Sequence, residues 1–155
     1  GPYATRTPKA PCKKAKARSK KQRRHAHRIA RYHLLGRGKP GRPHPAVNQP
    51  RVLEASLATG RAFALGLGIA GTTWRGGGKR TIEVELDAEG NTLAPAGYQT
   101  FVLVAYDRSK KVFVAKTAWG AHKGDRGYVT LSYDYIRAYA EVGLLIDAVS
   151  KRPRK

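Results

Sequence analysis

Bulky and small side chains alternate along residues 63–70. Phe63, Leu65, Leu67 and Ile69 take every second position, and Ala or Gly stands between them. A period of two is typical of a β-strand whose two faces differ. Because one face carries almost no side chains, we expect another part of a structure to approach it closely.

Six more apolar segments of strand length occur along the chain, separated by turn sequences rich in Gly, Asp and Asn. They are residues 52–58, 81–87, 100–106, 112–119, 127–133 and 141–149. Segment 100–106 is apolar on both faces, which places it centrally in a sheet. Short strands with regular turns predict a mainly β protein, a small antiparallel β-sandwich or barrel.

The stretch 134–149 leaves two options open. Asp134 could cap a helix. The apolar residues Val142, Leu144 and Ile146 also fit a strand.

Charge divides the chain into parts. Residues 1–50 carry fifteen Lys or Arg and no acidic residue, whereas residues 51–150 carry twelve basic and ten acidic side chains. The chain as a whole has a formal charge of +21. We therefore predict a basic arm (1–35), a Gly/Pro-rich linker (36–50), a β domain (51–150) and a basic tail (151–155).

The arm is expected to be partly helical and to order on phosphate. Its like charges oppose a free helix, although Ile29, Tyr32 and Leu35 recur at helical spacing. A cationic segment of this purity favours a polyanionic partner, bound through its phosphate backbone. The predicted nucleic-acid-binding residues are Lys13, Lys14, Lys16, Arg18, Lys20, Lys21, Arg23, Arg24, Arg28, Arg31, Arg37, Lys39, Arg42, Arg75, Lys79 and Arg80.

Two glycine-rich strings need structural context. Residues 66–71 read Gly-Leu-Gly-Ile-Ala-Gly, but they lie inside a strand pattern and open no helix, which argues against a dinucleotide site. Residues 76–81 lack the spacing of a phosphate loop, so Arg75, Lys79 and Arg80 are interpreted as a basic hairpin tip.

No metal or cofactor site is predicted. Cys12 is the only cysteine, which excludes an internal disulfide and fits a reducing compartment. The paired cysteines of a zinc site are absent, and His122 is the only histidine after residue 50. Glu83, Glu85 and Asp87 alternate along one predicted strand face, which leaves a metal-dependent nuclease as one hypothesis.

Trp74 and Trp119 each stand beside a glycine-containing loop with basic neighbours. Core packing is the expected role of both. Base stacking is the alternative.

Residues 98–150 resemble, weakly, the carboxy-terminal sheet of a bacterial domain family of unknown function. The likeness rests on the apolar strand 100–106, the turn Asp107-Arg108-Ser109-Lys110-Lys111, the string Thr117-Ala118-Trp119 and the closing segment 127–146. The resemblance implies an antiparallel β body, and it implies no active site or ligand.

The overall plan resembles viral coat and nucleocapsid proteins, in which a β shell domain follows a basic arm. That resemblance implies a structural, non-enzymatic virion component that binds RNA or DNA and other subunits of an assembly, with no membrane, cofactor or small-molecule substrate. The main alternative is a ribosomal protein, cytoplasmic or organellar, with an rRNA-threading extension. The nuclease is the second alternative.

Overall fold

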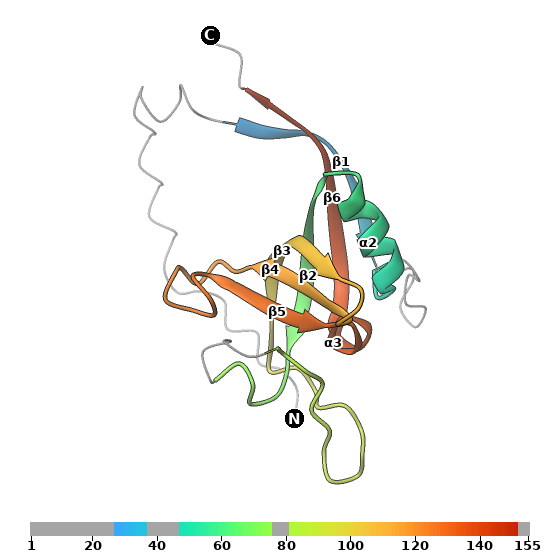
Figure 1. Cartoon of the computed structure of the whole chain (residues 1–155), viewed down its shortest axis with the longest axis vertical. Coiled ribbons are helices and arrows are strands. Elements are labelled where there is room, and N and C mark those ends of the chain that lie inside the picture. The colour runs from blue at the N-terminus through green and yellow to red at the C-terminus, as the bar shows by residue number, and fades with distance from the viewer. Residues whose placement is uncertain (1–26, 37–46, 76–80, 152–155) are drawn as a thin grey trace, which may run out of the picture. The chain divides into compact units, whose positions relative to one another are not determined.

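The computed structural model describes residues 27–36, 47–75 and 81–151 (Figure 1). The described residues between 29 and 149 form one compact unit. The elements in chain order are β1 (His27–Gly36), α2 (Pro50–Ala58), β2 (Ala62–Ile69), β3 (Gly97–Asp107), β4 (Val112–Lys116), β5 (Tyr128–Ser132), α3 (Tyr133–Tyr139) and β6 (Ala140–Lys151).

The six strands form one sheet in the order β1-β6-β2-β3-β4-β5. Strand β2 pairs antiparallel with β3 and with β6, so that Phe63 lies opposite both Leu103 and Leu145. The prediction of a mainly β, antiparallel protein is confirmed, and strand β3 is interior as expected. The described strands make a single sheet, whereas a two-sheet sandwich was one of the expectations.

The alternation along β2 separates core from surface as its sequence predicts. Phe63, Leu65 and Leu67 are completely buried. On the small-residue face, the position of a Cβ on Gly66 would be 2.7 Å from Val142 Cγ1, and that on Gly68 would be 2.9 Å from the Pro95 Cβ. The close approach expected at this face is therefore made by the chain's own side chains, and larger residues at the two glycines would collide with them.

Helix α2 occupies a segment for which a strand was predicted, so the prediction for 52–58 is wrong. Pro50 fits the first turn of a helix, where a backbone N–H has no partner to lose. Leu53 and Leu57 are four residues apart and face the sheet, which is the spacing of a helix face. Because Val52 and Leu53 are adjacent apolar residues, the segment resembled a strand and the four-residue spacing was not recognised.

A helix and a strand both occur in 134–149, one after the other, but Asp134 is not the cap, because it lies within the first turn of α3. The Ser132 hydroxyl accepts a hydrogen bond from the Tyr135 N–H at 3.1 Å and so caps α3. Strand β6 then begins at Ala140 and places Val142 opposite Gly66.

Two further expectations about strands are corrected. Residues 29–36 were expected to be helical but lie in strand β1, next to β6 at the edge of the sheet. Segment 81–87 makes only isolated bridges among the described residues, Ile82 with Leu131 and Leu86 with Thr92. The remainder of the basic arm lies outside the described residues, and the predicted domain boundaries stay predictions.

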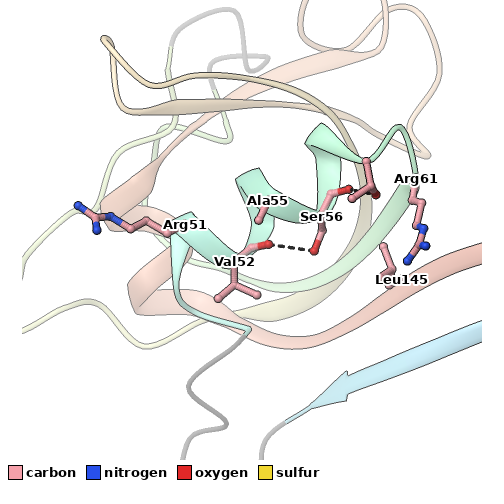
Figure 2. A pocket seen from close by; sticks show the side chains of 7 residues that line it. Arg51, Val52, Ala55, Ser56, Arg61 and Leu145 are labelled. Atoms are coloured by element: carbon pink, nitrogen blue, oxygen red, sulfur yellow. Dashed lines mark hydrogen bonds between the residues drawn. The ribbon is translucent and has the colours of Figure 1, made fainter.

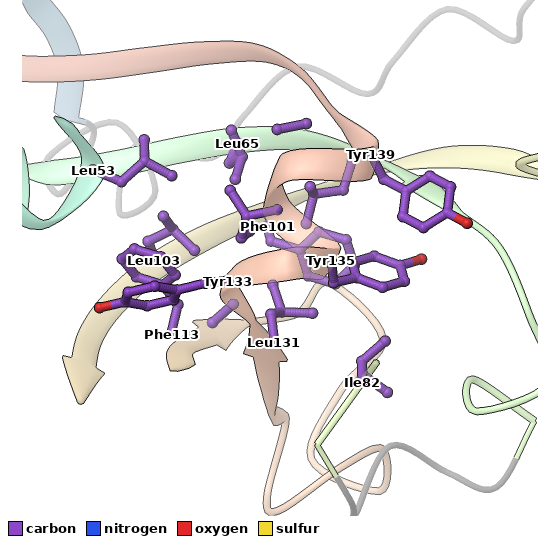
Figure 3. Close-up of a cluster of buried hydrophobic side chains, with 14 of the residues drawn as sticks. Leu53, Leu65, Ile82, Phe101, Leu103, Phe113, Leu131, Tyr133, Tyr135 and Tyr139 are labelled. Carbon is purple, nitrogen blue, oxygen red and sulfur yellow. The ribbon is translucent and has the colours of Figure 1, made fainter. Parts of the chain in front are cut away.

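The core lies between the sheet and the two helices (Figure 3). Its large, fully buried side chains come from both helices, from β2 to β5 and from the segment at Ile82. They are Tyr135, Phe63, Phe101, Phe113, Leu53, Leu65, Leu67, Ile82, Leu103, Leu131 and Ile136. The described helices have nine and seven residues, and neither is long or apolar enough to cross a membrane.

One carboxylate is buried within this core. Glu54 of α2 is 2% exposed and accepts hydrogen bonds from the Tyr133 hydroxyl and from the Arg108 guanidinium, whose Nε lies at 2.8 Å. The Tyr133 hydrogen bond, followed by that of Arg108, lowers the pKa of Glu54 against the opposing effect of burial. The three side chains, called the Glu54 cluster below, tie α2 to the β3–β4 turn and to the start of α3.

Candidate functional site

Four aromatic rings meet near the start of β3. Trp74 lies 5.5 Å from both Phe101 and Trp119, and 5.8 Å from Tyr135, between ring centroids. Phe101 and Trp119 meet edge to face at 5.7 Å. Edge-to-face and tilted pairs at these distances are favourable beyond the area that they bury. We call these four side chains the aromatic cluster.

The Tyr135 hydroxyl fixes one side of this cluster. It donates a hydrogen bond to the Gly68 carbonyl at 2.8 Å, and it accepts from Trp74 Nε1 at 2.8 Å and from the Ala70 N–H at 3.0 Å. Burial raises the pKa of Tyr135, so the group stays a neutral donor. The loop that carries Trp74 is therefore held to β2 by one buried phenol.

Polar groups lie on the other side, around Trp119. In the amide orientation that satisfies both contacts, Gln99 Oε1 accepts from Trp119 Nε1 at 3.0 Å and Gln99 Nε2 donates to the Tyr98 carbonyl at 3.2 Å. The backbone N–H of Trp119 donates a hydrogen bond to the Thr117 hydroxyl at 3.3 Å. Tyr98 itself is 62% exposed, so the polar groups here border on solvent.

The loop after Trp119 brings His122 to the same end of the sheet. It folds back on itself, since the Thr117 N–H donates to the Gly127 carbonyl at 2.9 Å. Gly124 has a φ of 62°, and a Cβ there would lie 1.9 Å from the backbone carbonyl oxygen of Tyr128, so the turn requires glycine. The exposed His122 ring lies beside Gly120, 3.3 Å from where a Cβ would stand.

Glu85 anchors the loop that leads into the aromatic cluster. Its Oε1 accepts from the Thr72 and Thr73 N–H groups at 2.7 and 2.8 Å, and both threonine hydroxyls donate to the carboxylate. The hydrogen bonds from Thr73, then those from Thr72, lower the pKa of Glu85 to about 2. At Gly71, φ is 86° and any Cβ would overlap the Glu85 carboxylate, which makes glycine necessary.

This geometry overturns the nuclease hypothesis. The Glu85 carboxylate is occupied by four hydrogen-bond donors, and Asp87 accepts from the N–H groups of Glu89 and Asn91. No group of His, Cys, Asp or Glu within 27–36, 47–75 and 81–151 could hold a metal ion. Glu85 and Asp87 therefore hold a loop and a turn.

Only three of the predicted phosphate-binding residues fall within the described part of the chain. Arg31 lies 3.4 Å from Asp147, a carboxylate that is 6% exposed, and Arg75 is exposed after the Trp74 loop. Arg28 lies in strand β1. The others lie outside the described residues: Lys13, Lys14, Lys16, Arg18, Lys20, Lys21, Arg23, Arg24, Arg37, Lys39, Arg42, Lys79 and Arg80. Their phosphate contacts stay untested predictions.

Sequence reasoning identified part of this site. Trp74 and Trp119 pack against the core, which confirms the expected role for both. Gln99 and Thr117 were not singled out, because nothing in an isolated Gln or Thr marks it. The string Thr117-Ala118-Trp119 was noted only for a resemblance, and the contact of Trp119 with Gln99 of β3 is supplied by the fold.

Similarity to known proteins is found among solved structures. No protein-family model matches the chain, and no curated protein matches it. The crystal structure of xylellain, a cysteine protease from Xylella fastidiosa, matches with a TM-score of 0.53 and 27% identity, over 66% of this chain and 38% of xylellain. The chain thus spans under two-fifths of xylellain's length.

Two structures that match with lower TM-scores are also proteases by their names. The Amb a 11 cysteine protease of ragweed pollen, in its proform, matches at a TM-score of 0.45 and 15% identity, over 74% of this chain and 32% of that protein. The bromelain protease of Ananas comosus, in complex with the inhibitor E64, matches at a TM-score of 0.44 and 17% identity, over 75% of this chain and 49% of that protein.

These findings correct the function predicted from the sequence. Xylellain is a cysteine protease, so the resemblance to viral coat and nucleocapsid proteins is wrong, as is the ribosomal alternative. The prediction of a non-enzymatic protein is contradicted by the match to xylellain, which is an enzyme. Nucleic acid and shell subunits as partners are likewise unsupported. The predicted location stays untested.

Proposed function

We propose that this chain is part of a papain-like cysteine peptidase, in which it contributes the sheet half of a site that acts on polypeptides. The observation that supports the proposal most is the likeness to xylellain, at 27% identity over 66% of the chain. The partly exposed Trp74 and Trp119, with Gln99 bound to Trp119 and the exposed His122 in the loop that follows, supply apolar surface and hydrogen-bonding groups. Peptide sites combine these two features.

Hydrolysis by this class of enzyme needs a thiolate and a base that takes its proton. Gln99 cannot be the base, because a carboxamide has no atom that accepts a proton at ordinary pH. His33 is paired with Asp147 at 2.6 Å. His122 is therefore our candidate for the base among the side chains that the structure describes.

The nucleophile must come from elsewhere. No cysteine lies within residues 27–36, 47–75 or 81–151, and Cys12 is the only cysteine of the sequence. The thiolate is thus that of Cys12 or of a cysteine outside residues 1–155. The backbone at Gln99 and the Trp119 side chain would position the substrate in either case.

The test uses the full chain in reducing buffer with a pool of fluorescence-quenched peptides. We expect hydrolysis that iodoacetamide abolishes and that His122→Ala lowers by about 10²-fold or more, the typical contribution of a general base. Lys123→Ala, in the same loop, is the matched control and should keep the activity. Loss of activity in Cys12→Ser would assign the nucleophile to this chain.

Two results oppose the proposal. Hydrolysis that survives iodoacetamide would exclude a cysteine mechanism. Absence of both hydrolysis and peptide binding, the latter followed through the Trp119 indole signal, would show that the chain does not act on polypeptides. Binding without hydrolysis by residues 1–155 would show that Cys12 is not the nucleophile and would place the thiolate outside this sequence.

A further inference from the structure

A groove runs along helix α2 on elements that the candidate site does not use (Figure 2). It has a volume of about 420 Å³ and is open to solvent. Val52, Ala55 and Leu145 form its apolar part. This size is within the range of specific binding sites, while the open form suits a segment lying along it better than an enclosed small molecule.

Positive charge marks both ends of the groove. Arg51 lies in the first turn of α2 and Arg61 lies three residues after its end, and the nine-residue helix is about 14 Å long. Both are exposed, and Figure 2 shows their guanidinium groups on opposite sides of the apolar surface. An anionic partner with an apolar face would match both features.

No carboxylate lines the groove. Asp147, the nearest acid that contacts a lining residue, is 6% exposed and is surrounded by Arg31, His33 and Arg61. Glu54 of the same helix is buried toward Arg108 and Tyr133. Arg61 pairs with Asp147 at 2.9 Å but shares that single carboxylate with Arg31, so the two arginines together keep a net positive charge at this end of the groove.

The chain's own remaining segments cannot fill it. All ten acidic residues of the sequence lie within the described ranges, so residues 1–26, 37–46, 76–80 and 152–155 contain none. Those segments are basic and would be repelled by Arg51 and Arg61. An anionic occupant must therefore come from outside residues 1–155.

We propose that this groove binds an acidic, amphipathic segment of another polypeptide, with apolar side chains on Val52, Ala55 and Leu145 and carboxylates at Arg51 and Arg61. The apolar surface between the two arginines distinguishes a polypeptide from a purely polar polyanion. The proposal does not depend on the peptidase function, because it shares no residue with the candidate site.

The experiment must separate the groove from the basic arm, which attracts any acidic peptide. Two synthetic peptides of about 14 residues serve as probes: one places Glu and Leu to form an amphipathic helix, and its isomer has the same composition in scrambled order. Binding to the full chain is measured by fluorescence anisotropy. Amide shifts in ¹⁵N spectra locate the contact.

We expect the amphipathic peptide to bind about tenfold more tightly than its isomer, with shifts at Val52, Ala55, Ser56 and Leu145. Ala55→Glu puts a carboxylate on the exposed groove surface without harming the helix, and it should remove the difference between the peptides. Ala88→Glu makes the same charge change on an exposed turn and should preserve it. Arg51→Glu should weaken the amphipathic peptide about fivefold.

Equal binding of the two peptides to the unmodified chain would overturn the proposal, since it would assign all binding to the arm. A difference that persists in Ala55→Glu, with its far-UV circular dichroism unchanged, would also overturn it. So would self-association of the chain that Ala55→Glu abolishes, because a second copy would then be the occupant.

Discussion

The Glu54 cluster and the aromatic cluster both bring polar groups to a packed interior, but they differ in what lies around them. Glu54 is 2% exposed and its partners satisfy it within the core. Around Trp119 the hydrogen bonds involve Gln99 and Thr117, and the adjoining residues Tyr98 and His122 are exposed.

This difference separates a structural role from a functional one. A buried, fully paired carboxylate fixes the position of α2 and offers nothing to a ligand. A half-buried amide such as that of Gln99, with exposed neighbours, can exchange its partners with a ligand. We therefore expect substitutions at the Glu54 cluster to act on stability, and those near Trp119 on peptide binding.

The largest expected loss of stability is in Glu54→Ala. It leaves the buried Tyr133 hydroxyl without its acceptor and opens a cavity under α2, which should lower the free energy of unfolding by about 3 kcal/mol. Arg108 is largely exposed and contributes less. Urea unfolding followed by circular dichroism measures the effect, and Glu89→Ala on an exposed turn is the control. A change below about 0.5 kcal/mol in Glu54→Ala would show that the Glu54 cluster does not stabilise the fold.

Tyr135→Phe should come next. The variant removes the hydroxyl that joins Gly68, Ala70 and Trp74, at an expected loss of about 1–3 kcal/mol in the free energy of unfolding. Because Trp74 loses its partner, the near-ultraviolet circular dichroism of the tryptophans should change as well. Tyr98→Phe on the exposed surface should do neither.

Glu85→Gln should have a pH-dependent effect on stability. The folded-state pKa of about 2 is below the ordinary value, so the ionised carboxylate stabilises the fold above pH 4.5. That contribution declines as the pH falls from 4.5 toward 2. Urea midpoints of the unmodified chain and Glu85→Gln should therefore differ at pH 7 and converge near pH 2. A constant difference would show that Glu85 is not the titrating anchor.

The sequence predicted β2 and β3 well because their burial is local and periodic. Phe63, Leu65 and Leu67 indicate a half-buried strand without any knowledge of its neighbours. Helix α2 was missed because its helical spacing involves only Leu53 and Leu57. The basic arm dominated the functional prediction, although charge alone does not identify a partner.

The candidate site could be predicted only in part, for a physical reason. Trp74, Gln99 and Trp119 lie far apart in the sequence and meet through strand pairing and the Tyr135 hydroxyl. No local pattern marks a Gln as the partner of an indole. The site exists as a tertiary arrangement, and the sequence provides its members without their contacts.

The smallest expected effect on stability is that of Gln99→Ala. Both contacts of the amide are half exposed, so the loss should be about 1 kcal/mol or less. Peptide binding should weaken more than stability does, because the Trp119 ring loses the acceptor that orients it. Thr100→Ala, an exposed neighbour on β3, is the control for both readouts. Equal losses in Gln99→Ala and Thr100→Ala would show that the amide has no special part in the site.

The most direct measurement follows the two indole N–H signals of the full chain during titration with an unstructured peptide pool. Trp74 and Trp119 are the only tryptophans, and Trp74→Phe assigns the signals. The account predicts a large, saturable shift of Trp119 and a small one of Trp74, whose indole is bound to the buried Tyr135 hydroxyl. If neither signal moves while the peptide pool remains uncleaved, the chain does not act on polypeptides through this end of its sheet.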